Sequence, residues 1–360
     1  MTGNQRPPHQ ETVRINAFDY FRAVAILVIV AGHTFPPWDI DTVAERALAN
    51  LIAGGTSLFV FISGFFLHSH FHGRTGPAAF VAGKLRTVIA PYVLMATAGF
   101  IVQGYVLGAF PHVDALVPPP PGPLHDVWLW GDYLLTGRIF VAYWYIPFIA
   151  ILFALTRQFY AYIDLSPTTR WTVMAVWFLA AMVIQRSALD LSPLHAALYF
   201  VPIYMAGINY SMHRTGIDRF IRAKTVPLGA LAVVLALTQA LTTTELGNLE
   251  KPTLLAYNGI DISTVQKMAL CLFCVAVLNR FETARLPVLK LLASASFAIF
   301  FIHPWVILAL NPKGLAGFYL FLPGIAVWLV NFALATAISL ALAVILKRLL
   351  GSRSRYVIGW

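Results

Sequence analysis

The feature that most constrains this chain is a series of apolar runs, several of them 18 residues or longer. About 20 apolar residues are needed for an α-helix to cross the roughly 30 Å hydrocarbon core of a bilayer. Only 11% of the residues are Asp, Glu, Lys or Arg, against roughly 25% in soluble domains. Since backbone polar groups in lipid need internal partners, these runs should be helices. The sequence therefore predicts an all-α, polytopic integral membrane helix bundle.

Polar, proline and glycine breaks separate the apolar runs and set the expected spans. We expect about ten transmembrane helices, near residues 18–35, 49–68, 87–110, 139–156, 171–188, 195–212, 226–243, 265–280, 288–310 and 319–346. The longest polar connection runs from Pro111 to Arg138. No cleavable-signal pattern follows the polar start of the chain. We therefore expect an N-terminal segment (1–17), one transmembrane domain (18–348) and a tail (349–360).

The basic residues are distributed unevenly between the two sides of this topology. Ten spans place both termini on one side, and 18 of the 25 Lys and Arg residues fall there, against five in the opposite loops. By the positive-inside rule, both termini should be cytoplasmic in a multi-pass protein of the plasma (bacterial inner) membrane. Contact with anionic membrane lipid accounts for most of the net charge of +10, so no nucleic-acid partner is expected.

The first span carries ionisable residues that a membrane helix rarely contains. Arg22 and His33 are eleven residues apart, which places them on one helix face about 16 Å from each other. Asp19 precedes Arg22 by three residues and can pair with it. Ionisable residues inside a span usually face the bundle interior and mark a functional site. The alternative is that Asp19, Arg22 and His33 only mark the two ends of the helix.

Four further segments carry recognisable motifs. They are FVFISGFFL (59–67), KLRTVIAPYVL (84–94), YWYIP (143–147) and SFAIFFIHPWVI (296–307). Together with the Arg-x10-His spacing of the first span, they resemble the acyltransferase family 3 membrane proteins, in the expected order from about residue 16 to 348. The resemblance implies an O-acyltransferase that moves an acyl group, commonly acetyl from acetyl-coenzyme A, onto a carbohydrate hydroxyl.

The predicted topology places histidines and cations at opposite ends. His33 and His303 should lie in the outer half of the membrane, and Arg86 at the cytoplasmic face. A histidine suits proton removal from a hydroxyl near neutral pH, so His33 is the expected base. His303 would orient the acceptor or stabilise the oxyanion. Arg86, or Arg22 as second candidate, would bind the donor phosphates, unless Arg86 is only a topology anchor.

Other motif residues have both a functional and a structural interpretation. Ser63 and Tyr92 are expected near the donor, although a serine before glycine in a membrane helix is more often a close-packing site. Tyr143, Trp144 and Tyr145 would contact the sugar or the acyl chain, or else anchor the chain at the membrane interface.

The sequence also bears on a transport function and on a metal site. A secondary transporter or lipid-linked-sugar exporter of the same span count is the alternative to an enzyme. Transporters commonly have paired halves, but the Arg22–His33 pattern has no counterpart around the fifth to seventh spans. The two cysteines, Cys271 and Cys274, lie inside an apolar run without a second ligand pair, so no metal site is expected.

Overall fold

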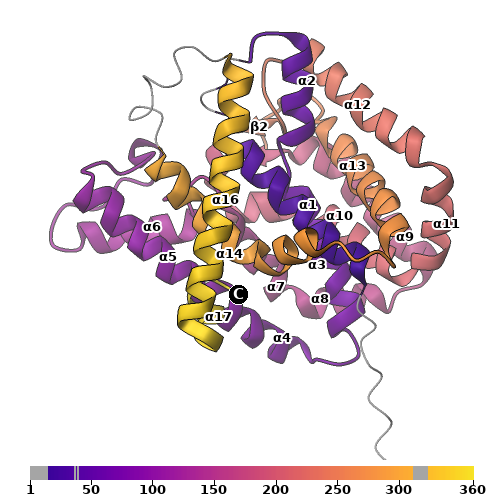
Figure 1. The fold of residues 1–360 in the computed structure, drawn as a ribbon, viewed down its shortest axis with the longest axis horizontal. Coiled ribbons are helices and arrows are strands. Elements are labelled where there is room, and N and C mark those ends of the chain that lie inside the picture. The colour runs from indigo at the N-terminus through magenta and orange to yellow at the C-terminus, as the bar shows by residue number, and fades with distance from the viewer. Residues whose placement is uncertain (1–14, 36–37, 39, 311–322) are drawn as a thin grey trace, which may run out of the picture.

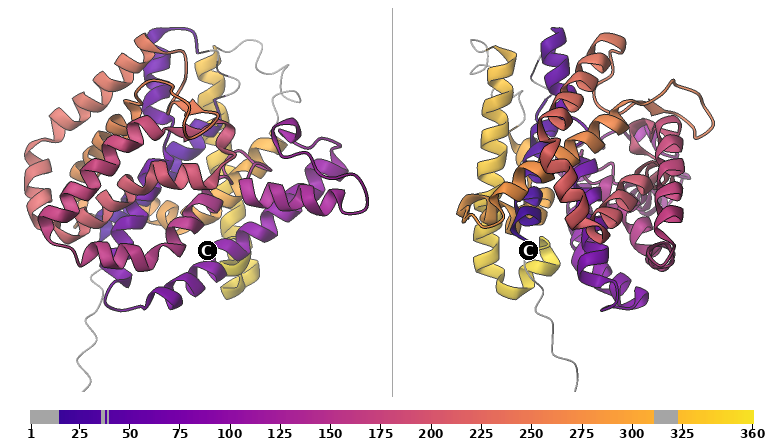
Figure 2. Two further views of the ribbon diagram at one scale, coloured as in Figure 1. Left: turned by 180° about the vertical axis from the view of Figure 1, so that it is seen from behind. Right: turned by 90° about the vertical axis from the view of Figure 1, so that its right-hand side faces the viewer.

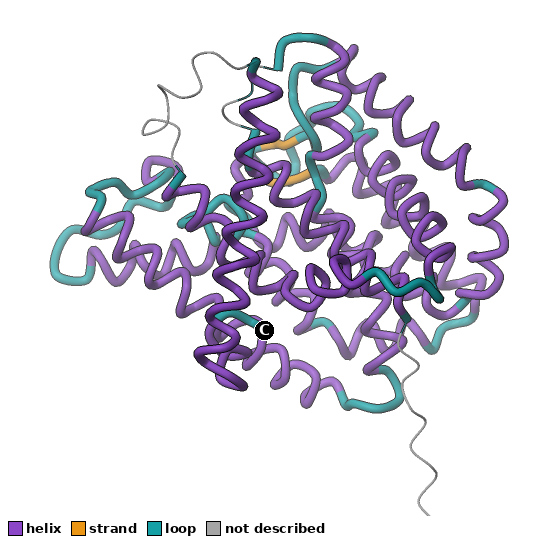
Figure 3. The backbone as a smooth tube through the Cα atoms, viewed as in Figure 1, coloured by secondary structure: helices purple, strands orange, loops and turns teal. Residues whose placement is uncertain are grey.

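The structure is a computed structural model of the 360-residue chain, and it describes residues 15–35, 38, 40–310 and 323–360. Nearly all of the described backbone is helical, apart from loops and one small sheet (Figure 3). The strands β1 (Arg186–Ser187) and β2 (Glu250–Lys251) pair in parallel. The predicted all-α fold class is therefore confirmed.

Many of the helices are joined by short turns. The first half of the chain forms α1 (Asn16–His33), α2 (Val43–Ile52), α3 (Thr56–Phe66), α4 (Pro77–Lys84), α5 (Ala90–Phe100), α6 (His125–Thr136), α7 (Tyr145–Ala154), α8 (Thr156–Ile163) and α9 (Pro167–Ile184). The second half forms α10 (Pro193–Met212), α11 (Arg214–Ala223), α12 (Thr225–Thr242), α13 (Ser263–Leu278), α14 (Pro287–Ala309), α16 (Gly324–Leu350) and α17 (Ser354–Val357). A longer connection leads from α12 to α13.

Within the described residues, eight helical segments are long and apolar enough to cross a membrane, or nine if the bent pair α7 and α8 is one span. All ten predicted spans overlap helices, although residues 319–322 of the last lie outside the described part. The predicted sixth span, α10, is not among the eight or nine. It is 20 residues long and mostly buried by other helices, so its polar residues can face the bundle interior and not lipid. The protein is a multi-pass membrane helix bundle.

The third span begins earlier than predicted because proline starts helices well. Proline lacks the N–H that would be unsatisfied in a first helical turn, and Pro77 occupies that position in α4. The span runs over Pro77–Val106 and includes the π-helical turns η2 (Leu85–Ile89) and η3 (Ile101–Val106). The predicted start at residue 87 was wrong.

The predicted polar connection from Pro111 to Arg138 contains the helix α6. Trp130 Nε1 donates a hydrogen bond to Thr97 of the third span at 3.0 Å. The Tyr133 hydroxyl donates to the carbonyl of Pro111 at 2.6 Å. These contacts fold the connection back against its own span. Figure 1 shows α5 and α6 side by side at the edge of the bundle.

The backbones of α3 and α10 approach closely in the middle of the bundle. A methyl group added to Gly64 would overlap the carbonyl oxygen of Tyr204, and one added to Gly207 would overlap the carbonyl oxygen of Phe61. Small residues allow membrane helices to pack in this way. Gly64 is therefore a close-packing site, which is the structural role considered for the Ser63–Gly64 pair.

The remaining helices surround this centre. α1 packs against α14 and α3, while α12 packs against α13 and α2. Figure 2 shows α16 along one outer side of the bundle. The start of α1 and Trp360 lie at the same end, which we call the terminal end, and the turn before α2 lies at the opposite, distal end (Figures 1 and 2).

The close contact of Gly207 with the backbone of Phe61 predicts that adding one methyl group lowers the stability of the protein. Gly207→Ala should destabilise the protein by about 1–3 kcal/mol, the usual range for overpacking a core, and lower its thermal midpoint in detergent. Gly131→Ala is the control, because no atom lies within 4 Å of its added methyl group. Equal thermal midpoints for the two variants would contradict the close helix contact.

Candidate active site

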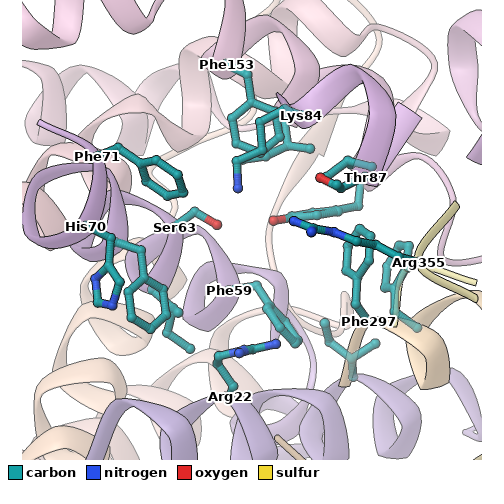
Figure 4. Close-up of a pocket in the computed structure, with 18 of the residues that line it drawn as sticks. Arg22, Phe59, Ser63, His70, Phe71, Lys84, Thr87, Phe153, Phe297 and Arg355 are labelled. Atoms are coloured by element: carbon teal, nitrogen blue, oxygen red, sulfur yellow. The ribbon is translucent and has the colours of Figure 1, made fainter. Parts of the chain in front are cut away.

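A cavity of about 530 Å³ lies between the helices at the terminal end of the bundle. Its lining comes from α1, α3 and the π-helical turn η1 (Leu67–Phe71) that follows it, α7, α14, the junction of α4 with η2, and the segment around α17. Figure 4 shows these side chains directed toward a common space. Segments distant in the sequence therefore share one partly enclosed site within the membrane domain.

Cations dominate the charge of this cavity. Arg22, Lys84 and Arg355 all line it, and Figure 4 shows their side chains converging from different elements. Arg22 Nη2 donates a hydrogen bond to Ser296 Oγ of α14 at 3.1 Å. Among the described lining residues, the only carboxylate is Asp19. The cavity is therefore positively charged and suited to an anionic ligand.

Lys84 is held by aromatic rings. Its Nζ lies 5.1 Å, 5.2 Å and 5.1 Å from the ring centroids of Phe71, Phe80 and Phe153. An ammonium group within about 6 Å of an aromatic face is attracted by the ring quadrupole. The rings position the cation without neutralising it, so its charge remains available to a ligand.

The lining becomes apolar with distance from the terminal end. On α1 it extends from Asp19 to Ile29, which is about 15 Å along a helix. Phe59, Ile149 and Phe300 continue the apolar lining on other helices. Such a cavity fits an elongated ligand that has its anionic part at the terminal end and its apolar part deeper in the membrane.

Two histidines meet beyond this apolar section. His33 Nδ1 lies 2.9 Å from His303 Nε2, and His303 Nδ1 lies 2.9 Å from the carbonyl oxygen of Ile299. His303 is fully buried, whereas His33 is partly exposed. Both histidines lie next to residues of the cavity lining. His33 follows Ile29 by one helical turn, and the ring centroids of Phe300 and His303 are 6.2 Å apart. The apolar end of the cavity thus leads toward the histidine pair.

The hydrogen bonds of the pair determine where the protons lie when both rings are neutral. A carbonyl oxygen only accepts, so His303 Nδ1 carries its hydrogen toward Ile299 and His303 Nε2 is an acceptor. His33 Nδ1 must then donate to His303 Nε2. His33 Nε2 is left with a free lone pair, which makes it the basic atom of the pair.

A charged cluster lies near the histidines, beside the small sheet. Arg186 binds Asp190 at 2.5 Å, lies 3.6 Å from Glu250, and stacks with its Cζ 4.5 Å from the Trp144 ring centroid. Arg138 lies 3.9 Å from Asp190. Burial alone would lower the pKa of the Arg186 guanidinium, but Asp190 and Glu250 raise it above its ordinary value. Arg186 therefore stays charged, and it acts electrostatically on His33.

The acyltransferase domain family matches residues 15–348, nearly the whole chain. The chain belongs to the acyltransferase 3 family. No curated protein and no solved structure gives a significant match. Membership of this family implies acyltransferase activity, with an acyl donor and an acceptor as substrates. The resemblance seen in the motifs is confirmed, and the cavity and the histidine pair are the candidate active site of a membrane acyltransferase.

The structure brings five of the predicted site residues of this acyltransferase together. Arg22, Ser63 and Tyr145 line the cavity, and His33 pairs with His303 beyond its apolar end. These five come from α1, α3, α7 and α14. Their roles in catalysis and binding stay predictions.

The other predicted residues lie apart from the cavity lining. Arg86 is exposed to the surroundings of the bundle. Tyr92 and Tyr143 are buried, and their hydroxyls donate to the carbonyls of Leu134 at 2.7 Å and Phe301 at 2.8 Å. Trp144 is covered by Arg186 on one face. These contacts are structural, and the predicted substrate roles of the four residues gain no support from them.

Sequence reasoning missed Lys84 and Arg355. Lys84 precedes Arg86 by two positions, and residues two apart on a helix lie on nearly opposite faces. With the span starting at Pro77, both belong to the helix, and the face toward the cavity carries Lys84. No sequence pattern pointed to Arg355 as a site residue, because it follows the last apolar run. No group of three His, Cys, Asp or Glu side chains in the described part of the chain is placed to hold a metal ion.

The cavity predicts differential labelling along α3. We expect Ser63→Cys, in a chain with alanine at positions 271 and 274, to react readily with a water-soluble thiol reagent because Ser63 lines the cavity. Ser57→Cys is the control on the same helix, since Ser57 is 1% exposed. Equal and slow labelling at both positions, measured by mass spectrometry, would contradict an open cavity.

Proposed function

We propose that this acyltransferase transfers an acyl group, with acetyl as the first candidate, from acyl-coenzyme A to a hydroxyl of a cell-surface or lipid-linked carbohydrate. The observation that carries the proposal is the polarity of the cavity. Its cations Arg22, Lys84 and Arg355 give way to an apolar section that leads toward the His33–His303 pair. A donor with a phosphorylated head and an uncharged, less polar acylated arm matches this order.

The positive end supports a coenzyme A thioester as donor. Coenzyme A carries several phosphate groups at one end and its thioester at the other. Guanidinium and ammonium groups in a partly enclosed site bind phosphate through charge-assisted hydrogen bonds. With the phosphates near Lys84 and Arg355, the arm would extend along α1 toward His33.

His33 Nε2 is proposed as the general base. In the transfer, the acceptor hydroxyl oxygen attacks the thioester carbonyl carbon while His33 Nε2 takes the hydroxyl proton. The carbon–sulfur bond then breaks, and the same proton passes to the departing thiolate to give free coenzyme A. His303 acts through His33 as a positioning residue, because its Nε2 accepts the His33 Nδ1 hydrogen and orients the ring.

The acceptor is proposed to arrive from the distal end. His33 is the last residue of α1 there, and it is partly exposed. Polar and charged groups surround this end, among them Arg138, Arg186 and Glu250. A carbohydrate has hydroxyls for such groups, and this position gives it access to the base without passing through the phosphate-binding end.

The orientation of the bundle is proposed from the charges of the loops. Because the predicted ten-span topology assigns 18 of the 25 basic residues to the side of the termini, the terminal end would face the cytoplasm. Acyl-coenzyme A is made there, and the cavity would receive it directly. The distal end would then face outward across the plasma (bacterial inner) membrane, where surface carbohydrate is available.

Substitution of His33 tests the proposed base. His33→Ala should lower acyl transfer by about 100- to 10,000-fold, the usual contribution of a positioned base. His33→Gln should be nearly as inactive, because glutamine keeps hydrogen bonding but does not accept a proton at neutral pH. Transfer is measured with purified protein, acetyl-coenzyme A and a surface glycan, by the mass increase of one acetyl group. Near-normal activity of His33→Gln would refute the mechanism.

His303 provides the matched comparison for this test. His303→Gln keeps an oxygen acceptor for the His33 Nδ1 hydrogen, whereas His303→Leu removes it. We expect kcat to fall more in the leucine variant than in the glutamine variant, with the KM for the donor unchanged in both. An equal loss in both variants would contradict the positioning role.

A further inference from the structure

The segment after α16 folds back under the bundle. Lys347 Nζ donates a hydrogen bond to the carbonyl of Trp360 at 2.9 Å, and the hydroxyl of Ser354 donates to the same carbonyl. Ser354 is completely buried. The turn that begins at Gly351 is therefore closed by side chains of the segment itself and of the preceding helix.

A glycine allows this segment to reach the cavity. Gly359 has a φ of +75°, a conformation that residues with a side chain rarely adopt. A methyl group at this position would overlap the ring of Phe297, which also lines the cavity. The segment is thus seated directly on α14, and its α17 helix packs against α5 and η2.

Arg355 is carried by this segment to the cavity. Figure 4 shows its guanidinium directed into the same space as the Lys84 ammonium and the Ser63 hydroxyl. Lys84 comes from the opposite wall, where three phenylalanine rings hold it. The two cations are close enough to interact electrostatically. Holding two like charges at one cavity disfavours the empty site and favours a ligand with more than one negative charge.

The family assignment does not account for Arg355. The matched region ends at residue 348, before the segment begins. The described structure nevertheless makes Arg355 and Gly359 part of the cavity lining. A residue outside the family domain therefore completes the site.

We propose that Arg355, presented by residues 351–360, forms with Lys84 a phosphate-binding site for the acyl donor at the terminal end of the cavity. This inference rests on the proposed function for the identity of the donor. The guanidinium offers a planar fork of N–H donors to phosphate oxygens, and the ammonium adds a point charge. Donors that lack phosphate would gain nothing from either group.

Equilibrium binding in nanodiscs of phosphatidylcholine tests the proposal. The probes are coenzyme A and pantetheine, which lacks all phosphate groups. Arg355→Ala should weaken coenzyme A binding by about 10-fold or more, as expected for a lost charge-assisted hydrogen bond, and leave pantetheine binding unchanged. Arg355→Lys should recover part of the affinity. Equal coenzyme A affinity of the wild-type protein and Arg355→Ala would overturn the inference.

The control lies in the same segment. Arg353 is two residues away and is exposed, as Arg355 is, but only Arg355 is among the lining residues. Arg353→Ala should therefore bind coenzyme A as the wild type does. Gly359→Ala keeps every charge but displaces the segment, and it should reproduce the loss seen in Arg355→Ala. A loss as large in Arg353→Ala as in Arg355→Ala would show that only net charge matters and would also overturn the inference.

The binding experiment also separates two other possibilities, a donor without phosphate and a lipid headgroup as the source of the phosphate. If wild-type protein binds coenzyme A no better than pantetheine, the donor assignment in the proposed function fails, and the phosphate site fails with it. The phosphate could also belong to a lipid headgroup, so the binding is repeated with phosphatidylglycerol in the nanodiscs. An effect of Arg355→Ala that appears only with this anionic lipid would assign the site to lipid and overturn the proposal.

Discussion

One face of α1 is polar inside a membrane, and the arrangement of the bundle depends on how that face is enclosed. Charged and imidazole groups are costly in contact with lipid, so they must face protein or a polar cavity. Arg22 meets Ser296 and His33 meets His303, so the same helix, α14, covers both ends of the face. The close contact of α3 with α10 at Gly64 and Gly207 supports the opposite wall.

Enclosing this face yields a site with two chemically different ends. At the terminal end, Lys84 lies among aromatic rings and Arg22 donates a hydrogen bond to Ser296. At the other end, the hydrogen bonds of the histidine pair run in one direction, from His33 through His303 to the carbonyl of Ile299. Arg22 and His33 lie about 16 Å apart along α1, so the apolar lining between them separates the proposed donor-binding end from the proposed base. This separation is the physical basis of the proposed division between donor binding and catalysis.

The sequence alone predicts the helices and the shared face of Arg22 and His33, because both depend on local periodicity. It places His33 and His303 at similar depth but not in contact, since the pairing of α1 with α14 is a tertiary result. Lys84 was missed because the third span was expected to begin at residue 87, three positions after it. The site residue Arg355 could not be found from periodicity, because only the folded segment around Gly359 brings it to the cavity.

The central claim is that a single elongated donor occupies the cavity, with its phosphates at the cations and its acyl group at the histidines. The most direct test is a cryo-electron microscopy structure in nanodiscs with a thioether analogue of acetyl-coenzyme A, which cannot transfer its acyl group. We expect phosphate density beside Lys84 and Arg355 and the carbonyl group beside His33 Nε2. Density in the reverse orientation, or outside this cavity, would contradict it.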